Sequence, residues 1–247
     1  MDYTVKSFKQ LNSTNSYAKE HLAQLEDKTV IVAETQTAGR GRFERKWISD
    51  VVGNLFCSFV LKPCELATPE VLSNLTQFLS VVLAETFEKY NVKADIKWPN
   101  DVLVDGKKIA GILAEASFGE GCFKGIVLGV GVNLNLKNSE IKVIDQPATA
   151  LNLVLKEDIN LQEFSEKLFN SFFDEYETFM LEGFQLIKKR YLQRCTFIGN
   201  EILIKNLDNK KQGIAHQIND DGSLLLKTIN NSYETVRIGD LTCLKTN

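Results

Sequence analysis

The chain has 247 residues, of which 29 are Lys or Arg and 32 are Asp or Glu, so its formal net charge is −3. This charge excludes a uniformly basic protein that coats nucleic acid, and the 44% hydrophobic content excludes a largely disordered chain. The longest apolar run, residues 125–132 with glycine included, is too short for a transmembrane helix. The chain opens on polar residues and not on the apolar core of a signal peptide, so we expect a cytoplasmic protein without a membrane partner.

The first predicted elements are two strands separated by a helix. Residues 3–8 alternate polar and apolar side chains, which predicts a strand. Ser13-Thr14-Asn15 offers N-cap candidates for a helix that runs to about Leu25. The β-branched run Thr29–Ala33 predicts a buried strand, and the glycines and charges of residues 35–50 predict a long loop.

A strand and an amphipathic helix are predicted next. Leu55–Leu61 is a continuous apolar run of strand length. Thr68 and Pro69 are typical of an N-cap and a first helical residue, and the apolar stripe that follows them continues to Phe87.

The middle of the chain predicts further strands. Residues 102–104 and 109–114 flank Asp105-Gly106, which is the pattern of a β-hairpin. Residues 125–136 predict another strand, and at a sheet edge this strand would support a homodimer. Both a monomer and a homodimer stay open.

The last part of the chain changes character. Apolar residues from Leu161 to Phe179 line one face of a predicted helix. After Tyr191, turn residues separate short strand-like runs at residues 196–204, 213–218, 224–228 and 235–238. We therefore expect an α+β domain over residues 1–192 and a small β module over residues 193–247.

Cysteine and histidine contents limit the chemistry. Five cysteines form no C-x-x-C pair, and only His21 and His216 accompany them. No zinc ligand set therefore has a usable spacing, and neither a Ser-His-Asp nor a Cys-His arrangement is expected. The sequence indicates that lysine and arginine carry the chemistry.

The densest motif is the segment from Gln36 to Trp47, which reads Q-T-A-G-R-G-R-F-E-R-K-W. Glycines at positions 39 and 41 let the backbone approach a ligand closely, and arginine side chains match carboxylate and phosphate oxygens. The segment is therefore typical of a loop that closes over a polyanion such as ATP. It is no P-loop, because no G-x-x-x-x-G-K-[ST] occurs in the chain.

Two further motifs accompany this loop. Lys97-Trp98-Pro99-Asn100-Asp101 precedes the hairpin that carries Lys108, so oxygen ligands and a positive charge occur close together in sequence. Gly129-Val130-Gly131-Val132-Asn133 has glycines within a strand, which mark a bulge or the close approach of another group. Structural and ligand-binding roles are both open for these glycines and for Ser13-Thr14-Asn15.

In this order, residues 36–47, 97–101, 108–113 and 129–133 resemble the biotin–protein ligases (biotin–[acetyl-CoA-carboxylase] ligases). Ser13-Thr14-Asn15 is similar to the amino-terminal biotin-contact motif of that family, and Gly213–Asp240 resembles its C-terminal module. The resemblance covers nearly the whole chain. It implies an α+β fold: a class II synthetase-like catalytic domain with a mixed or antiparallel sheet and helices, followed by a small SH3-like β-barrel.

The resemblance also implies a two-step reaction with ATP and biotin as substrates and Mg²⁺ as the metal. Biotin carboxylate attacks the α-phosphate of ATP and gives biotinyl-5′-AMP and pyrophosphate. A lysine of a biotin carboxyl carrier protein, as in acetyl-CoA carboxylase, then attacks the mixed anhydride and releases AMP.

Residue roles follow from the same resemblance. The ureido head of biotin would be bound by Ser13, Thr14, Asn15 and Gln36. Further implied biotin contacts are Gly39, Arg40, Gly41, Arg42, Lys108, Gly111, Gly129 and Gly131. ATP or the adenylate would contact Arg40, Arg42, Arg45, Lys46, Trp47, Asn100, Asp101, Lys108 and Asn133. Lys108 and Arg42 are the implied catalytic residues, and Asp101 is the implied Mg²⁺ ligand.

The chain departs from the family pattern at one loop position. Glu44 stands where the family usually has a glycine, and its carboxylate could pair with Arg42 or Arg45. In addition, some relatives carry an amino-terminal helix-turn-helix domain, whereas the catalytic pattern here begins with residues 3–8. We therefore expect a monofunctional ligase that does not bind DNA.

Two alternatives remain. A lipoate–protein ligase or octanoyltransferase has the same fold and also modifies a lysine, but it binds an acyl tail without a ureido ring. A non-catalytic RNA-binding module could use the basic loop, although the chain is acidic overall and has no face on which basic and aromatic residues interleave.

Overall fold

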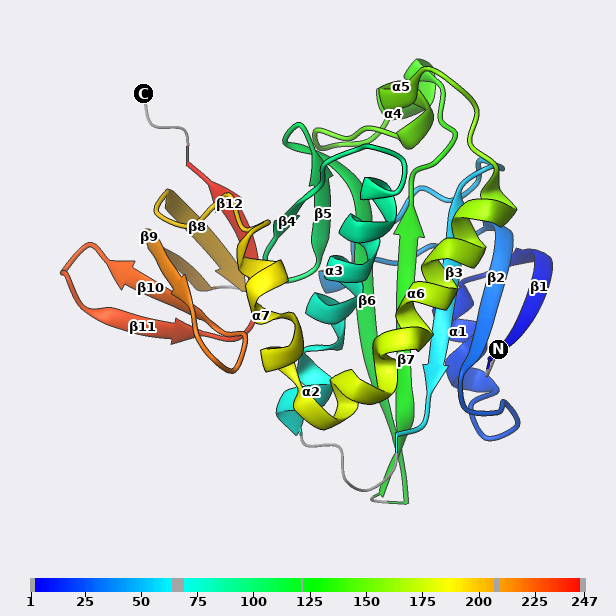
Figure 1. The fold of residues 1–247 in the computed structure, drawn as a ribbon, viewed down its shortest axis with the longest axis horizontal. Coiled ribbons are helices and arrows are strands. Elements are labelled where there is room, and N and C mark those ends of the chain that lie inside the picture. Colours follow the sequence, from blue (N-terminus) through cyan, green and yellow to red (C-terminus); the bar gives the residue numbers. More distant parts are fainter. Residues whose placement is uncertain (1–2, 64–68, 121, 207–208, 245–247) are drawn as a thin grey trace.

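The computed structural model describes residues 3–63, 69–120, 122–206 and 209–244, which form two β-sheets and the helices that flank them (Figure 1). The larger sheet has seven strands in the order β1-β2-β3-β7-β6-β5-β4. These strands are β1 (Thr4–Leu11), β2 (Thr29–Gln36), β3 (Leu55–Leu61), β4 (Asp95–Lys97), β5 (Asp101–Val104), β6 (Lys107–Gly119) and β7 (Cys122–Val132). β1 and β2 pair in parallel and the other neighbours pair antiparallel, so the expected mixed sheet is confirmed.

Helices cover the large sheet on both faces. They are α1 (Thr14–Glu20), α2 (Pro69–Ser73), α3 (Leu75–Glu88), α4 (Asn138–Ile141), α5 (Leu151–Leu155), α6 (Leu161–Glu182) and α7 (Phe184–Leu192), together with a short 3-10 helix at Arg42–Glu44. α3 and α6 lie over one face of the sheet, and α1 lies behind it in Figure 1.

The side chains of β3 point alternately to these two faces of the sheet. Cys57, Phe59 and Leu61 pack in the main core with residues of α3 and α6, whereas Val60 packs with Ala18 and Leu22 beside α1. Because successive side chains of a strand point to opposite faces, Ser58 lies on the same face as Val60. That face carries the cavity described below.

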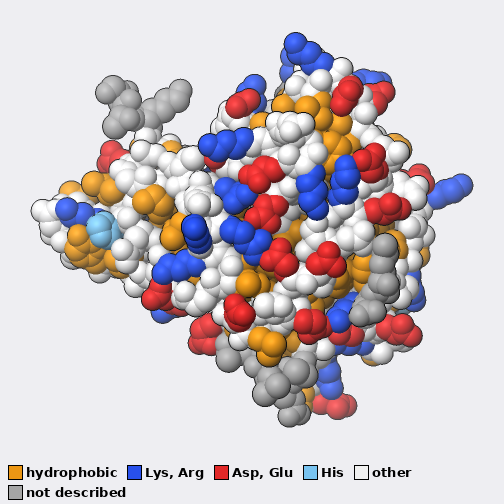
Figure 2. Space-filling model, viewed as in Figure 1, with side chains coloured by type: hydrophobic (Ala, Val, Ile, Leu, Met, Phe, Trp, Pro, Cys, Tyr) orange, Lys and Arg blue, Asp and Glu red, His pale blue; other side chains and the backbone are white. Residues whose placement is uncertain are grey.

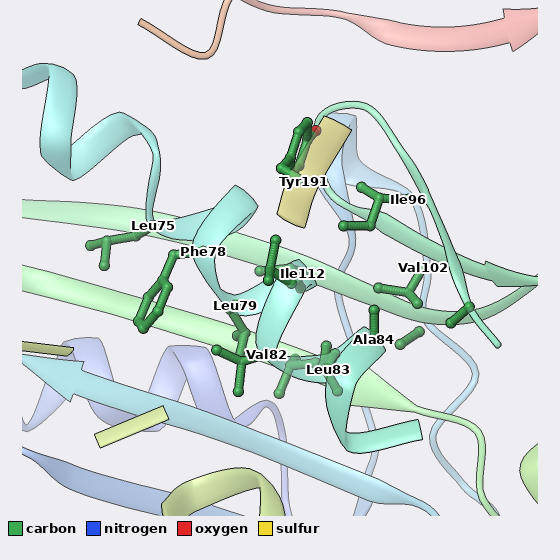
Figure 3. Packing of buried hydrophobic residues seen from close by; sticks show 14 of the residues in the cluster. Leu75, Phe78, Leu79, Val82, Leu83, Ala84, Ile96, Val102, Ile112 and Tyr191 are labelled. Atoms are coloured by element: carbon green, nitrogen blue, oxygen red, sulfur yellow. The ribbon is translucent and has the colours of Figure 1, made fainter. Parts of the chain in front are cut away.

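The main core consists of aliphatic residues and aromatic rings. Figure 3 shows Phe78, Leu79 and Val82 of α3 in one cluster with Ile112 of the sheet. The ring of Phe78 stacks on that of Phe179 of α6 with a centroid separation of 4.4 Å. The predicted apolar face of α6 is confirmed, whereas α3 is buried on nearly all sides because it lies between the sheet and the helices α6 and α7.

Ion pairs connect the solvent-facing sides of α3, α6 and α7. Figure 2 shows acidic and basic side chains intermixed on this helical face. Arg190 of α7 pairs with Glu85 of α3 at 3.0 Å and also with Glu175 of α6. Arg194 pairs with Glu88 at 2.7 Å, so α7 is tied to both neighbouring helices.

The smaller sheet lies beside the larger one (Figure 1). Its strands are β8 (Glu201–Asn206), β9 (Asn209–Ile218), β10 (Leu224–Thr228), β11 (Tyr233–Val236) and β12 (Asp240–Cys243), in the order β11-β10-β9-β8-β12. These five antiparallel strands fit the expected small SH3-like module. Trp98 Nε1 and Gln77 Nε2 both donate to Gly222 O, at 3.2 and 2.8 Å, and join the two sheets.

Several predicted boundaries are wrong. The helix after Ser13 ends at Glu20 and continues to Leu25 only as turns, and the strand predicted to end at residue 136 ends at Val132. The helix predicted to run to Phe87 is divided at Asn74, and Thr68 lies outside the described residues. Residues 196–200 precede the first strand of the small sheet, and β4, β12 and α7 were not predicted.

The edge position that residues 125–136 would need in order to support a homodimer is not found. β7 lies between β3 and β6 and bonds to both, so it has no free edge. β1 and β4 form the edges of the large sheet. Within the described residues, no helix has both the length and the apolar content that crossing a membrane requires.

Candidate active site

A cavity of about 510 Å³ opens on the face of the large sheet that carries α1. It collects residues from α1, β2, the arginine loop (residues 37–47), β5, β6, β7 and the small sheet. Every residue for which a role was predicted lines this cavity except Gly39, whose missing side chain would meet Ser49 Oγ and Trp47 O inside the loop. The predicted contact residues, far apart in sequence, thus surround one space.

One end of the cavity is uncharged and rich in hydrogen bonds. Ser13 caps α1, and its side chain accepts from the backbone N–H of Ser16 at 3.5 Å. The N–H of Thr14 donates to Gln36 Oε1 at 2.8 Å. Ser58 Oγ lies 2.6 Å from Asn15 Oδ1 and 2.8 Å from Thr14 Oγ1. All but Ser16 of the residues named here are buried, so the polar atoms of these buried residues depend on one another or on a ligand.

Asn15 also fills the space above a strand glycine. A Cβ atom at Gly129 would lie 2.0 Å from Asn15 Oδ1, so only glycine admits Asn15 at this point of β7. Asn15 Nδ2 donates to the carbonyl of Leu113 at 3.2 Å and to Glu115 Oε2 at 2.9 Å. Gly129 therefore accommodates the helix α1 in this structure.

Glu115 of β6 connects the uncharged end to the arginine loop. Its carboxylate accepts from Asn15 and pairs with Lys19 at 2.8 Å and with Arg40 at 2.9 Å. Burial alone would raise the pKa of Glu115, but the hydrogen bonds from Lys19 and Asn15 and the charge of Arg40 outweigh it. The pKa of this carboxyl is therefore lower than its ordinary value, and the group is held ionised.

The arginine loop folds back on itself. The N–H of Gly41 donates to Arg45 O at 2.7 Å, and the N–H of Trp47 donates to Gly39 O at 3.0 Å. Phe43, at the tip, has a φ of 51°, which a non-glycine residue rarely adopts. The predicted long loop is thus partly ordered by its own backbone, although the side chain of Glu44 lies outside what the structure describes.

Two arginines of this loop, Arg42 and Arg45, bind the small sheet. Arg42 NH1 lies 3.2 Å from Asp240 Oδ1 and donates to Gly239 O at 3.2 Å, and Arg45 NH2 lies 2.7 Å from Asp240 Oδ2. Arg42 NH1 also donates to Asn100 Oδ1 at 2.9 Å. Burial lowers the pKa of Arg42, with Asp240 opposing the shift, yet the guanidinium stays charged.

Lys108 lies on the floor of the cavity. Its Nζ is 2.8 Å from Asp101 Oδ1 and 5.3 Å from the ring centroid of Trp47. Both partners of this ion pair are largely shielded from solvent, since their side chains are 16% and 13% exposed. A single ammonium group is therefore held between a carboxylate and an aromatic face.

Trp47 lies over two other strand glycines. A Cβ atom at Gly131 would come within 2.4 Å of Trp47 Cε2, and one at Gly111 within 2.9 Å of Trp47 Cζ3. Trp47 Nε1 is buried and has no hydrogen-bond partner among the described residues. These glycines were predicted to let the strands lie against a ligand. In this structure the side chain of Trp47 lies against them.

Loop residues complete the wall of the cavity. Asn133 donates from Nδ2 to Thr149 O at 3.0 Å, which holds the chain after β7 beside the residues that follow α4. Residues 143–146 also line the cavity and were not predicted.

The cavity residues do not fit a preformed Mg²⁺ site. Asp101 Oδ1 is paired with Lys108, and Asn100 Oδ1 accepts from Arg42. Across the described ranges, no three His, Cys, Asp or Glu side chains are grouped as metal ligands. Asp101 is therefore the counter-ion of Lys108 in this structure.

Ser58, Glu115 and Asp240 were missed as functional candidates. Ser58 is the single polar residue of the buried strand Leu55–Leu61, which is a signal that the sequence contains. Glu115 follows the motif from Lys108 to Leu113 on the same strand face, two residues after Leu113. Asp240 has no local signal, because it approaches the loop only through the packing of the small sheet.

Comparisons with known proteins agree with this geometry. Residues 7–133 match the Biotin/lipoate A/B protein ligase family. The chain is 30% identical over 220 residues to the biotin–[acetyl-CoA-carboxylase] ligase of Paracoccus denitrificans. This alignment covers 87% of this chain and 91% of that protein. It is 33% identical over 204 residues to the bifunctional ligase/repressor BirA of Bacillus subtilis (strain 168), which covers 81% of this chain but 62% of that relative.

Solved structures share the whole architecture. A mutant biotin protein ligase from Aquifex aeolicus in complex with biotin has a TM-score of 0.83 and 26% identity, with 100% of both chains covered. The Aquifex aeolicus biotin protein ligase in complex with biotin and ATP has a TM-score of 0.82 and 24% identity, with 98% and 99% covered. The fold therefore extends over both sheets.

Proposed function

The chain belongs to the Biotin/lipoate A/B protein ligase family, and on this basis we propose that it is a biotin–protein ligase. It uses ATP to activate biotin as biotinyl-5′-AMP and transfers the biotinyl group to a lysine of a biotin carboxyl carrier protein. The observation that carries this proposal is the division of one cavity into an uncharged hydrogen-bonding end and a cationic end.

The cationic end suits adenylation. A carboxylate oxygen of biotin attacks the α-phosphorus of ATP, the bond from that phosphorus to the bridging oxygen of the β-phosphate breaks, and pyrophosphate leaves. Lys108, Arg40 and Arg42 supply charge-assisted donors to the carboxylate and phosphate oxygens, whose negative charge shifts during this step. Arg45 and Lys46 line the side on which pyrophosphate is expected to leave.

Transfer to the acceptor completes the reaction. The neutral amine of the acceptor lysine attacks the acyl carbon of biotinyl-5′-AMP, the acyl C–O bond breaks, and AMP leaves. The amine proton is lost, and an amide bond remains. Trp47 and the folded arginine loop cover the cavity floor, which supports a role in shielding the anhydride from water.

Biotin is favoured over lipoate by the uncharged end of the cavity. The ureido ring of biotin has two N–H donors and a carbonyl acceptor, whereas a dithiolane ring has neither. Ser13, Thr14, Asn15 and Gln36 offer hydroxyl and amide groups that match a ureido ring without a buried charge. The name of the Paracoccus relative, a biotin–[acetyl-CoA-carboxylase] ligase, supports the same choice.

The wider context of the protein is also proposed. The acceptor is a carboxylase carrier domain, as the name of the Paracoccus relative indicates for that protein. We place the protein in the cytoplasm and assign residues 1–192 to catalysis and residues 193–247 to the SH3-like module. DNA binding is not part of this proposal.

The test is ATP–pyrophosphate exchange with purified protein. Exchange that depends on biotin and is absent with lipoate is the expected result. Exchange with lipoate alone would favour the lipoate ligase reading, and an absence of exchange with either acid would contradict a ligase. Transfer is then measured as incorporation of biotin into a carrier domain and into its Lys→Arg variant, which should stay unlabelled.

A further inference from the structure

Residues outside the cavity determine which groups at its uncharged end donate hydrogen bonds and which accept them. Asn15 and Gln36 each carry an amide with a donor end and an acceptor end, and either amide could in principle be reversed. Which end faces the cavity decides which head group the cavity can accept. The neighbours of the two amides leave one orientation for each.

The orientation of Asn15 is fixed by Glu115. A carboxylate and a backbone carbonyl can only accept hydrogen bonds, so the atom of Asn15 that lies 2.9 Å from Glu115 Oε2 and 3.2 Å from Leu113 O is the amide nitrogen. Both N–H groups are therefore used within the protein. The oxygen of Asn15 accepts from Ser58 at 2.6 Å and keeps a second lone pair.

The orientation of Gln36 is fixed by Thr14. The backbone N–H of Thr14 can only donate, so the atom of Gln36 at 2.8 Å from it is the carbonyl oxygen. Gln36 lines the cavity, and its amide nitrogen is then its donor end, for which no hydrogen-bond acceptor is found among the described residues. The single proton of Ser58 is used on Asn15 Oδ1, so Ser58 Oγ accepts from the hydroxyl of Thr14 at 2.8 Å and holds Thr14 in place.

We propose that Ser58 and Glu115 are positioning residues that determine specificity by fixing an acceptor at Asn15 and a donor at Gln36. Such a pair selects a small neutral head group that has both N–H donors and a carbonyl, a cyclic urea, over a ring without hydrogen-bonding atoms. This inference deepens the proposed function and rests on it. Ser58 itself is completely buried and does not line the cavity, so it acts through Thr14 and Asn15.

The first test is Ser58→Ala, assayed by pyrophosphate exchange. We expect the KM for biotin to rise about five- to tenfold, the effect of losing one buried hydrogen bond, while the KM for ATP is unchanged. The KM for desthiobiotin, which retains the urea, should rise in parallel. Ser58→Cys keeps the side-chain size and a weak donor, so its KM for biotin should rise less.

The matched control is Ser80→Ala. Ser80 is equally buried, but it lies in α3 and donates to Gln77 O at 2.7 Å, on the other side of the sheet. We expect a loss of thermal stability there with no change in the KM for biotin. If Ser58→Ala lowers stability as Ser80→Ala does but leaves the KM for biotin unchanged, Ser58 has only a structural role and the proposal is overturned.

Glu115→Gln provides the second test. A glutamine there cannot accept from Asn15, Lys19 and Arg40 without turning one of its own N–H groups toward a donor. We expect a rise in the KM for biotin and also for ATP, because Arg40 loses its partner. An unshifted KM for biotin would contradict the role of Glu115, whereas wild-type protein that shows no biotin exchange would contradict the proposed function itself.

Discussion

Lys108 has two neighbours that set its position, the carboxylate of Asp101 and the ring of Trp47. Lys108→Ala is expected to slow biotin-dependent exchange by about 10²–10³-fold, roughly 3–4 kcal/mol, because it removes a charge-assisted donor aimed at developing negative charge. Exchange rates at saturating substrates check this. The control is Lys107→Ala at the exposed neighbouring position, and equal activity in both variants would remove Lys108 from the mechanism.

Glu115 links the stability of the site to pH. Its pKa is lower in the folded protein than the ordinary value of about 4.3. Its contribution to stability is therefore fully present above that value and is lost as the pH falls through the folded pKa. Urea unfolding should show that wild-type protein exceeds Glu115→Gln in stability at pH 7, and that this excess shrinks below about pH 4. A difference that is constant from pH 7 to pH 3 would contradict the assignment.

At the residue scale, the sequence predicted the residues that line the cavity better than the residues that support them. The arginine loop, Lys108 and Ser13-Thr14-Asn15 occur as compact motifs, so their chemistry can be recognised locally. Ser58 and Asp240 act through residues far away in the chain, at separations of 43 positions from Asn15 and 198 from Arg42. Only the packing of the sheet, helix α1 and the small module places Ser58 behind the cavity residues and Asp240 in the cavity wall.

At the scale of elements, local signals predicted the strands and the hairpin well. Asp105 and Gly106 adopt positive φ values of 49° and 70°, as the predicted turn requires. The folded arginine loop was harder to predict, because its shape depends on Trp47 lying over Gly131 of a distant strand. The three-residue strand β4 is too short to give a periodic signal.

The contact between Trp47 and β7 can be tested with Gly131→Ala. The added methyl group would lie 2.4 Å from Trp47 Cε2, so the ring must move and the protein should lose about 1–3 kcal/mol of stability. Displacement into solvent should shift the tryptophan emission to longer wavelength, because the other tryptophan, Trp98, stays buried. Gly119→Ala is the control, since it meets only the flexible end of Lys124; an emission maximum that both variants share with wild type would contradict this contact.

At the scale of the whole molecule, Asp240 makes the small sheet part of the cavity. Asp240→Ala should release Arg45 and leave Arg42 with only the carbonyl of Gly239 as its partner there, so trypsin should cleave the arginine loop several-fold faster than in wild type. The cleavage sites are identified by mass spectrometry. Glu234→Ala removes another ion pair of the small sheet, that with Lys211, and should leave the loop cleavage rate unchanged. Equal rates in Asp240→Ala and wild type would show that the loop is held by its own fold.

The pairing of the cavity cations has a further consequence. Arg40, Arg42, Arg45 and Lys108 each have a carboxylate of the protein beside them. At these four side chains an incoming triphosphate therefore replaces a carboxylate that is already present as a counter-ion. The binding free energy of a polyanion therefore depends on how well its oxygens match several donors at once. A polyanion whose shape does not match these donors binds weakly.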